Sequence, residues 1–377
     1  MKSVPIRNPA LRGMECIRCK AYLPTDDYLM GCPSCHALGW PSNVSPVYDA
    51  ARLGTYRNLP YLNFPSLGEG NTPLIKSDHL SMALGVNLYL KLESANPTGS
   101  HKDRCSALTA ARALDIGAEE IVCASNGNGG ISLAAYSARA GLACAVATTT
   151  SLDSCTRSAL LMLGARIIQF DRSVDRWQYL AGHLGSKTHF PATNACFPPT
   201  GSCAFGVDAY KSIAYELSDF FLDRGINYVI APAARGDLIW GLSRGLVEIA
   251  SSAGSASPPK VIAAEPYPRI SVALSTNDYR QTFPGDAFAT PSIASDTVTY
   301  QALCALRATA GAAVVVTPEE VMDAHRQSWR HGHIMERSSS AAVAAALKLG
   351  REGQFNSDDI VVVVVTASAW REDFRPG

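Results

Sequence analysis

One lysine follows a Pro-Thr-Gly turn and precedes a run of small residues, in the stretch SANPTGSHKDR at residues 94–104. Ser100 followed by Asp103 is typical of a helix capping pair, so we expect a helix to begin near His101. Lys102 would then lie in the first turn, where the helix dipole disfavours a cation and lowers the pKa of the amine. Such an amine can attack a carbonyl carbon. The local pattern alone leaves open a solvated lysine at a helix start.

Four cysteines near the N-terminus form two Cys-x-x-Cys pairs with twelve residues between them: Cys16, Cys19, Cys32 and Cys35. Two such pairs can bring four thiolates to tetrahedral distance around zinc, which stabilises a segment too small to have a core of its own. The spacer is slightly shorter than the common zinc-ribbon spacing. Two disulfides or four free thiols remain the alternatives, but the pattern favours a zinc-ribbon-like segment.

The balance of charge argues against a nucleic-acid partner. The chain has 377 residues with 33 lysines and arginines and 33 aspartates and glutamates, so its formal net charge is zero. Zinc ribbons also occur as nucleic-acid modules, but here Arg18 and Lys20 are offset by Asp26 and Asp27 between the outer cysteines. A structural role for the ribbon is therefore favoured.

Neither a membrane span nor a signal peptide is expected. No apolar run approaches 18 residues, and no apolar segment follows a basic start; the longest apolar stretch, IVVVVVTASAW, is short and strand-like. Seven further cysteines, scattered through apolar sequence, suit a reducing compartment. We expect a cytoplasmic protein with no membrane partner.

The elements that must position these residues alternate along the chain from residue 86 onward. Short β-branched runs are followed by helical patterns, which indicates parallel sheets covered on both faces. About eight strands are expected, too many for one small sheet, so we predict an α/β fold of two doubly wound lobes with mostly parallel sheets. Residues 276–300 are rich in Pro, Ser, Thr and Asp and predict a long surface loop.

Two turns with glycines lead from a predicted strand into a predicted helix, at residues 124–130 (ASNGNGG) and 231–237 (APAARGD). In open α/β sheets ligands bind at such strand ends, and the amides of a helix N-terminus can hold a carboxylate or a phosphate. The glycine spacing fits neither a Rossmann nor a Walker fingerprint. Each turn alone is a weak signal, since many strand-to-helix turns need small residues.

Taken together, these residues resemble a known family. NPTGSHKDR is similar to the cofactor-lysine motif of threonine synthases and their relatives, the fold-type II pyridoxal-5′-phosphate (PLP) enzymes of the tryptophan synthase beta superfamily. Four other blocks resemble family segments in the expected order: GEGNTPL (68–74), ASNGNGGISLAAYSARAG (124–141), DAYKSIAYEL (208–217) and MERSSSAAVAAAL (335–347). Some threonine and cysteate synthases also begin with a zinc-ribbon-like segment.

The resemblance implies a division of the chain. A zinc-ribbon-like segment would span residues 14–50 and a small substrate-binding lobe residues 101–204. A large PLP-binding lobe would combine residues 51–100 and 205–377. A homodimer is expected as the commonest state of soluble enzymes.

The resemblance also implies residue roles. Lys102 would form the internal Schiff base with PLP and then shuttle protons, and Asn128 would bond the phenolate oxygen of the cofactor. Thr366 would face the pyridine nitrogen. A neutral hydroxyl there does not keep that nitrogen protonated, which suits elimination and replacement chemistry more than transamination. The alternative for Thr366 is a strand-end hydroxyl that caps the backbone.

In the first glycine turn, the resemblance implies that Ser125, Asn126 and Gly127 receive the substrate carboxylate on their backbone amides and on the Ser125 hydroxyl. The chain departs from the family here, because Asn126 replaces a serine and Gly129 a threonine. Those hydroxyls help to hold the substrate phosphate in threonine synthases, which puts O-phosphohomoserine in doubt.

The second turn departs further. The family loop that binds the cofactor phosphate is commonly Gly-Asn-Gly-Gly, and the aligned residues here are Ala234, Arg235, Gly236 and Asp237. Arg235 could replace lost backbone donors with a charge-assisted contact to phosphate. Asp237 would repel the phosphate, so we expect it to cap the following helix.

The main hypothesis is therefore a PLP-dependent lyase of amino-acid biosynthesis that acts at the β or γ carbon of a small activated amino acid, such as O-phosphohomoserine. A β-replacement synthase of the cysteate or cysteine type, using O-phosphoserine or an acylated serine, is one alternative. A serine or threonine dehydratase-like ammonia-lyase is another. A non-enzymatic protein that keeps only the fold is the remaining hypothesis.

Overall fold

The structure, a computed structural model, describes residues 4–49, 58–254 and 257–372. Its contacts divide the chain into two compact units. The first combines Met1–Glu69, Lys102–Ser212 and Thr299–Gln301, and the second combines Gly70–His101, Ile213–Val298 and Ala302–Gly377. The predicted boundary between residues 50 and 51 lies outside the described residues, and the predicted lobes stay a prediction.

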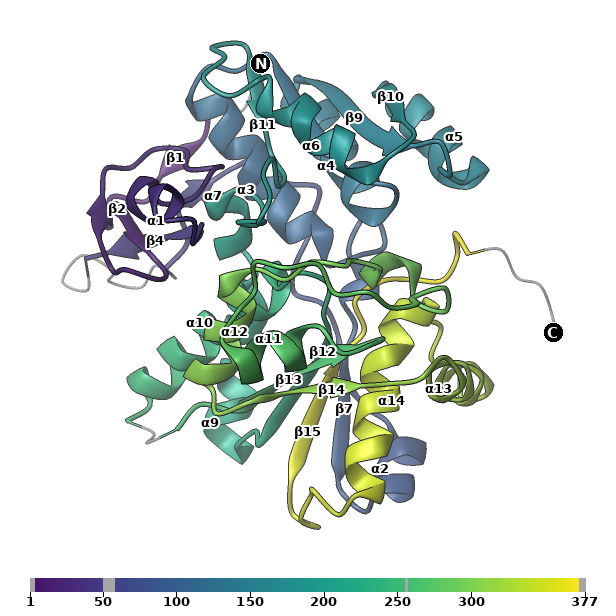
Figure 1. The fold of residues 1–377 in the computed structure, drawn as a ribbon. Helices are drawn as coiled ribbons and strands as arrows, with labels where there is room; N and C mark the ends of the chain where they lie inside the picture. Colours follow the sequence, from purple (N-terminus) through teal and green to yellow (C-terminus); the bar gives the residue numbers. More distant parts are fainter. Residues whose placement is uncertain (1–3, 50–57, 255–256, 373–377) are drawn as a thin grey trace. The chain divides into compact units, whose positions relative to one another are not determined.

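The first unit contains a four-stranded parallel sheet in the order β10-β9-β8-β11 (Figure 1). Because consecutive strands are parallel, the chain must return between them, and helices make most of these returns. Buried residues of α3 and α4, such as Leu108 and Ile131, form one core with Val146 of β9. The elements are β8 (Glu120–Ala124), β9 (Ala143–Thr149), β10 (Arg166–Phe170), β11 (His189–Pro191), α3 (Lys102–Asp115), α4 (Asn128–Ala140), α5 (Ser154–Met162), α6 (Ser173–Ala181) and α7 (Ala204–Asp208).

The N-terminal part of the first unit is a small antiparallel sheet in the order β3-β2-β4. Strands β1 and β5 pair antiparallel and form a separate two-stranded sheet. The zinc-ribbon-like segment has little apolar core of its own, because Met14, Cys16 and Val44 are buried in the same cluster as helix α3. The elements are β1 (Ile6–Arg7), β2 (Leu11–Cys16), β3 (Tyr22–Leu23), α1 (Pro33–Ala37), β4 (Val44–Tyr48) and β5 (Tyr61–Asn63).

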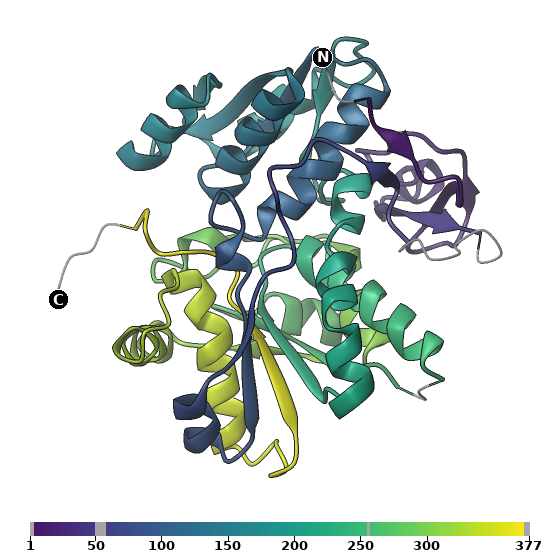
Figure 2. The same cartoon turned by 180° about the vertical axis from the view of Figure 1, so that it is seen from behind.

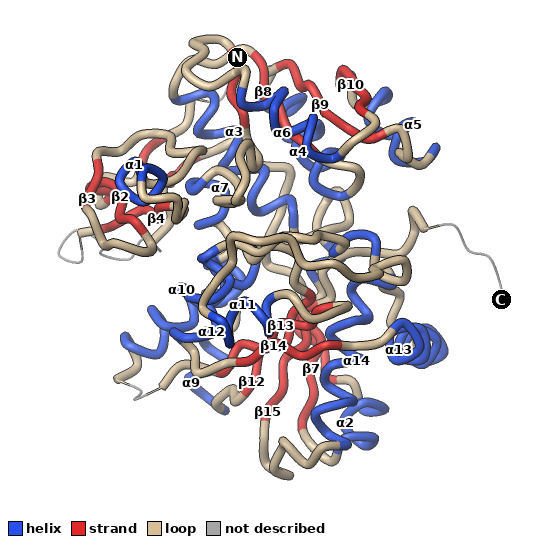
Figure 3. The backbone as a smooth tube through the Cα atoms, in the orientation of Figure 1, coloured by secondary structure: helices blue, strands red, loops and turns tan. Residues whose placement is uncertain are grey.

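The second unit contains a six-stranded sheet in the order β14-β13-β12-β15-β7-β6, visible as the largest group of strands in Figure 3. All neighbours are parallel except β6, which pairs antiparallel with β7 at one edge. The last strand of the chain, β15, lies between β12 and β7, and all five of its β-branched residues are buried. The strands are β6 (Leu74–Lys76), β7 (Asn87–Lys91), β12 (Tyr228–Pro232), β13 (Lys260–Glu265), β14 (Ala312–Val315) and β15 (Ile360–Val364).

Helices cover this sheet, and α2 and α14 lie side by side (Figures 1 and 2). Helix α14 packs its run of alanines against the sheet, because small side chains allow close approach of helix and strands. The helices are α2 (Asp78–Leu84), α8 (Lys211–Glu216), α9 (Ser218–Arg224), α10 (Asp237–Ser252), α11 (Ile270–Thr276), α12 (Tyr300–Ala308), α13 (Pro318–Arg330) and α14 (Arg337–Arg351), with 3-10 turns η2 (Glu93–Ala95) and η3 (Pro291–Ile293).

The predicted α/β fold with parallel sheets is confirmed. The predicted loop at residues 276–300 is irregular apart from η3, but it is not simply a surface loop, because Tyr279, Phe283 and Val298 are buried. In the described ranges, no helix is both long and apolar enough to span a membrane.

Candidate active site

Lys102 is the first residue of α3, as the turn before it predicts. The predicted cap is wrong, however. The Ser100 hydroxyl is fully buried and has no hydrogen-bond partner among the described residues. The backbone of Ser100 instead forms an isolated antiparallel bridge with Ala367, and α3 begins two residues later at Lys102, so Ser100 is not in the capping position.

The turn that precedes the lysine is held by the chain after β15. The His101 amide donates to the Thr366 carbonyl at 2.8 Å, and the Ser368 amide donates to the Gly99 carbonyl at 2.8 Å. Arg371 Nη1 donates to the Thr98 carbonyl, also in this turn, at 2.7 Å. These bonds fix the backbone that leads into Lys102.

The Thr366 hydroxyl is buried and lies 2.8 Å from the Ser339 hydroxyl of α14. Ser339 Oγ also accepts from the Ala367 amide at 2.9 Å. The alternative of a backbone cap for Thr366 does not match this arrangement, because its hydroxyl pairs with a side chain. Both groups are neutral, so this strand end offers a ligand a hydroxyl and no charge.

The amine of Lys102 lies 5.9 Å from the ring centroid of Tyr210, a buried residue between α7 and α8. The next residue, Asp103, is also buried and accepts from the Ser132 hydroxyl of α4 at 2.7 Å. This bond places the N-terminal ends of α3 and α4 next to each other. Lys102 is therefore not a fully solvated lysine, and Tyr210 is a neighbour that sequence analysis did not identify.

The first glycine turn leads from β8 into α4, as predicted. Ser125 Oγ accepts from the Gly130 amide at 2.9 Å and from the Gly127 amide at 3.3 Å. The turn thus already uses the hydroxyl that was expected to bind a carboxylate. A Cβ at position 130 would lie 3.0 Å from Val146 Cγ1, so close packing favours glycine here. Asn128 begins α4, where helix amides favour an anion.

The side chain of Asn126 is anchored rather than free. Its amide nitrogen donates to Thr149 Oγ1 at 2.6 Å, and its carbonyl oxygen accepts from the Thr149 amide at 2.9 Å. Arg176 Nη1, from the first turn of α6, donates to the same oxygen at 3.1 Å. The fold therefore places the cation Arg176 beside the glycine turn at residues 124–130. No motif in the sequence indicated this contact.

The second turn leads from β12 into α10. Gly236 has φ +123°, and a Cβ there would lie 2.5 Å from Ala302 Cβ. Both the dihedral angle and the space require glycine at this position. The prediction that Asp237 caps the helix is wrong, because Gly236 occupies the N-cap without a side-chain bond and Asp237 is the first helical residue. Its carboxylate still gains from the helix dipole.

Arg235 lies in this turn and is half-buried. Burial lowers the pKa of Arg235, and the nearby charges of Asp237 and Asp296 act in the opposite direction. The turn thus combines a guanidinium with the N-terminal amides of a 16-residue helix. Both are donors suited to a phosphate.

A buried arginine that sequence analysis missed supports this turn. Arg269 Nη2 donates to the Ala233 carbonyl at 2.7 Å, and Nη1 donates to the Ile293 carbonyl at 3.1 Å. Arg269 follows Glu265 by four residues, and both side chains are fully buried. Glu265 accepts from the amides of Ile270 and Arg269, so the ion pair is embedded in backbone contacts.

The residues fit a phosphate-bearing cofactor on three observations. The turn at Gly236 opens the 16-residue helix α10, whose N-terminal amides can hold an anion, the cation Arg235 stands at this helix N-terminus, and the buried Ser100 hydroxyl lacks a protein partner among the described residues. An unpartnered buried hydroxyl is costly unless a ligand or water bonds to it.

The four N-terminal cysteines converge. Their Sγ atoms all lie within 4.8 Å of one another, with Cys16 and Cys35 at 3.6 Å and Cys19 and Cys32 at 3.7 Å. These distances exclude disulfides in this structure, because a disulfide is about 2.05 Å long. A tetrahedron of thiolates about 2.3 Å from zinc has edges of about 3.8 Å. The cluster therefore fits the dimensions of a zinc site.

Comparisons with known proteins agree with this arrangement. Threonine synthase of Methanocaldococcus jannaschii is 28% identical over 380 residues, covering 95% of this chain and 92% of the relative. Threonine synthase of Mycobacterium bovis is 29% identical over 312 residues, covering 81% and 83%. Among solved structures, maize serine racemase matches with TM-score 0.68 at 17% identity, covering 79% of this chain and 88% of that one.

The L-serine ammonia-lyase of Rhizomucor miehei also matches with TM-score 0.68, at 19% identity, covering 79% of this chain and 94% of that one. At such identities the two structures support the fold alone. Residues 65–367, most of the chain, match the family described as "Pyridoxal-phosphate dependent enzyme". The chain therefore belongs to the pyridoxal-phosphate dependent enzyme family.

Proposed function

We propose that this enzyme is a lyase that eliminates or replaces a group at the β or γ carbon of an activated amino acid, with O-phosphohomoserine as the first candidate. The observation that carries the proposal is Lys102, which heads α3 beside the turn that opens α4. Relatives called threonine synthase match over most of the chain, which supports this reaction class.

In the first unit, Lys102 would hold PLP covalently and move protons at the substrate carbons. The Asn128 side chain would bond the oxygen on the cofactor ring. Ser125, Asn126 and Gly127 would hold the substrate carboxylate. Because the Ser125 hydroxyl and the Asn126 amide are already engaged, these side chains would have to exchange their present hydrogen bonds for bonds to the carboxylate.

In the second unit, the turn of Ala234, Arg235, Gly236 and Asp237 would hold the cofactor phosphate, and Thr366 would bond the ring nitrogen. Bound PLP would supply an electron sink for the carbanion formed at the substrate α carbon. The neutral Thr366–Ser339 pair would keep that sink moderate, which would favour elimination and replacement.

A β-replacement synthase acting on O-phosphoserine is the second candidate. Arg176 at the first turn favours a substrate with an anionic leaving group over free serine, because a guanidinium bonds phosphate well. A dehydratase-like ammonia-lyase is the third candidate. Its substrate would carry no anionic leaving group for a cation to bind.

The test begins with Lys102. The purified protein should absorb visible light through its lysine-bound cofactor, and borohydride should trap that cofactor on Lys102 for detection by mass spectrometry. Lys102→Ala should lose both signals. A colourless wild type without trapped cofactor would reject the proposal.

A substrate screen then separates the candidates. O-phosphohomoserine, O-phosphoserine, O-acetylserine, free serine and free threonine are each incubated with and without sulfur nucleophiles, and phosphate release and product mass are recorded. Threonine formed from O-phosphohomoserine supports the first candidate. A keto acid formed from free serine or threonine supports the ammonia-lyase.

We also propose that Cys16, Cys19, Cys32 and Cys35 hold one structural zinc ion, which the size of the thiol cluster supports. Metal analysis of protein purified without chelators should find about one zinc per chain. A cytoplasmic homodimer completes the proposal, and light scattering on the purified protein tests the assembly.

A further inference from the structure

The last residue of β4, Tyr48, reaches the junction of α7 and α8. Its hydroxyl donates to Asp208 Oδ2 at 2.5 Å, and Lys211 Nζ lies 3.2 Å from the same oxygen. The ammonium of Lys211 also lies 4.5 Å from the centroid of the Tyr48 ring. The side chains of Asp208 and Lys211 are fully buried, so Tyr48 contributes to both members of a buried ion pair.

The two residues of this ion pair, Asp208 and Lys211, flank Tyr210 in the sequence. Asp208 ends α7 and Lys211 begins α8, so Tyr210 lies in the two-residue junction between them. The ring of Tyr210 is the group 5.9 Å from Lys102 Nζ. The ion pair thus holds the backbone on both sides of Tyr210, since only two residues separate Asp208 from Lys211.

Contacts with α3 close the other side of the junction. A Cβ at Gly206 would overlap Thr109 Oγ1, so α7 and α3 are already at their closest approach. Arg104 Nη1 donates to Ser212 Oγ at 2.8 Å, just beyond Lys211. The junction between α7 and α8 therefore packs closely against α3. Tyr48, from the N-terminal segment, contacts the same junction.

A buried charged pair is stable only when its remaining bonding capacity is satisfied. Tyr48 supplies a hydroxyl to the carboxylate and an aromatic face to the ammonium. We propose that Tyr48 is a positioning residue that keeps the Tyr210 ring beside the Lys102 amine through Asp208 and Lys211. The N-terminal segment then acts as part of the active site and not as a separate module.

The ring face of Tyr210 favours the protonated form of the amine, since cation–π contacts stabilise ammonium ions. Loss of the Tyr48 hydroxyl should loosen Tyr210 and leave a larger fraction of Lys102 as reactive free amine. A cation–π contact of about 0.5–1 kcal/mol corresponds to about a two- to fivefold change in that fraction. This change can be measured without substrate.

The experiment uses cofactor-free full-length protein with its metal retained. Lys102 is acetylated by a limiting amount of acetic anhydride at fixed pH, and mass spectrometry gives its rate relative to exposed Lys76 in the same molecule. Tyr48→Phe should raise the relative rate about two- to fivefold. The matched control is Tyr22→Phe, because Tyr22 is 62% exposed and its hydroxyl bonds a backbone carbonyl, that of Arg12, within the same segment.

Tyr210→Leu, which removes the ring itself, should raise the relative acetylation rate of Lys102 in the same way. This variant tests whether the assay responds to loss of the ring. An unchanged Lys102 rate in Tyr48→Phe would overturn the proposal, as would an equal rise in Tyr22→Phe. In the loaded enzyme, Tyr48→Phe should lower kcat with little change in KM. Only this prediction for kcat and KM rests on the proposed role of Lys102. If Lys102 does not bind PLP, the acetylation result still decides whether Tyr48 positions Tyr210.

Discussion

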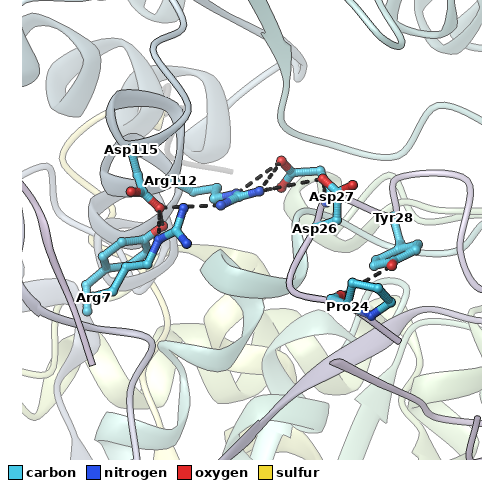
Figure 4. Close-up of polar contacts among 8 residues, drawn as sticks. Arg7, Pro24, Asp26, Asp27, Tyr28, Arg112 and Asp115 are labelled. Carbon is cyan, nitrogen blue, oxygen red and sulfur yellow. Dashed lines mark hydrogen bonds and ion pairs between the residues drawn. The ribbon is translucent and has the colours of Figure 1, made fainter. Parts of the chain in front are cut away.

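The guanidinium of Arg112 forms a two-pronged ion pair with the carboxylate of Asp27. Arg112 Nη2 lies 2.8 Å from Asp27 Oδ2, and Nε lies 3.0 Å from each carboxylate oxygen (Figure 4). Arg112 belongs to the last turn of α3, is 3% exposed, and lies 4.6 Å from the Phe205 ring. Asp27 belongs to the spacer between the two cysteine pairs. The helix that begins with Lys102 is thus tied to the N-terminal segment at its other end.

Asp27→Asn should lower the free energy of unfolding by about 3 kcal/mol, because it leaves a buried guanidinium without its main counter-charge. The neighbouring Asp115 compensates only weakly, since its carboxylate lies 3.4 Å from Nη1. Urea unfolding followed by circular dichroism measures the change.

Asp26→Asn is the matched control for this substitution. Asp26 is 71% exposed and lies 3.7 Å from the same guanidinium, so its loss should cost under about 1 kcal/mol. Equal effects of the two substitutions would mean that the geometry of the Asp27 pair does not matter for stability.

Removal of metal should unfold the N-terminal segment first. Its apolar residues, such as Met14 and Val44, are shared with the core of α3, and the four thiolates would repel one another once the proposed zinc ion is gone. We expect a chelator to lower the melting temperature and to raise hydrogen exchange in residues 11–48 before the six-stranded sheet is affected. Cys155→Ser, which changes an exposed cysteine outside the cluster, should leave zinc content unchanged.

Much of the fold could be predicted because its strands are long and apolar. The buried run of β15 and the helices that follow β8 and β12 show clear periodicity. In the two larger sheets, the short strands β6, β11 and β14 were not predicted, because three or four residues give no period to read. They pair only at the edges of their sheets, where tertiary contacts decide the structure.

The candidate site was predictable where a motif fixes the backbone, as at Lys102 and at the four cysteines. It was not predictable where distant segments meet. Tyr48 is separated from Asp208 and Lys211 by over a hundred residues, and only the fold shows that its side chain contacts this ion pair. Local rules failed at Ser100 for the same reason, since its bridge to Ala367 overrides the capping pattern.

Gly236→Ala should weaken both folding and cofactor retention. A Cβ at this position meets Ala302 at 2.5 Å, and φ +123° is unfavourable for alanine. Gly353→Ala separates the two causes, because Gly353 has φ +68° and a Cβ added there would meet no heavy atom within 4 Å. Calorimetry should show a loss of about 1–2 kcal/mol for Gly353→Ala and a larger loss for Gly236→Ala. Similar losses would show that α12 yields to the added methyl group.

Arg235→Ala should weaken PLP binding about tenfold to a hundredfold, the effect of losing about 1.5–3 kcal/mol from a charged hydrogen bond. Fluorescence titration of the cofactor-free protein measures this. Pyridoxal, which lacks the phosphate, is the matched control ligand, and its affinity should not change. A parallel loss for both ligands would indicate that Arg235 supports the fold of the turn and does not contact phosphate.

His325 gives the second unit a pH dependence with a defined sign. Burial, reinforced by the charges of Arg337 and Arg326, lowers the pKa of His325 to about 4. Its Nδ1 lies 3.1 Å from Ser340 Oγ, and its ring lies 5.6 Å from that of Trp329. The folded protein therefore keeps this imidazole neutral under conditions in which the unfolded chain protonates it.

Since the unfolded state binds the extra proton, the free energy of unfolding falls as the pH decreases from about 6.5 to about 4 and levels off below that range. Between pH 7.5 and pH 5 this group should contribute a loss of about 2 kcal/mol. His325→Gln cannot be protonated in this range, so its free energy of unfolding should fall less steeply by that amount. Urea unfolding of both proteins at pH 7.5 and pH 5 measures the difference, which cancels the contributions of the other histidines. Parallel pH profiles would show that His325 titrates near its ordinary pKa in the folded protein.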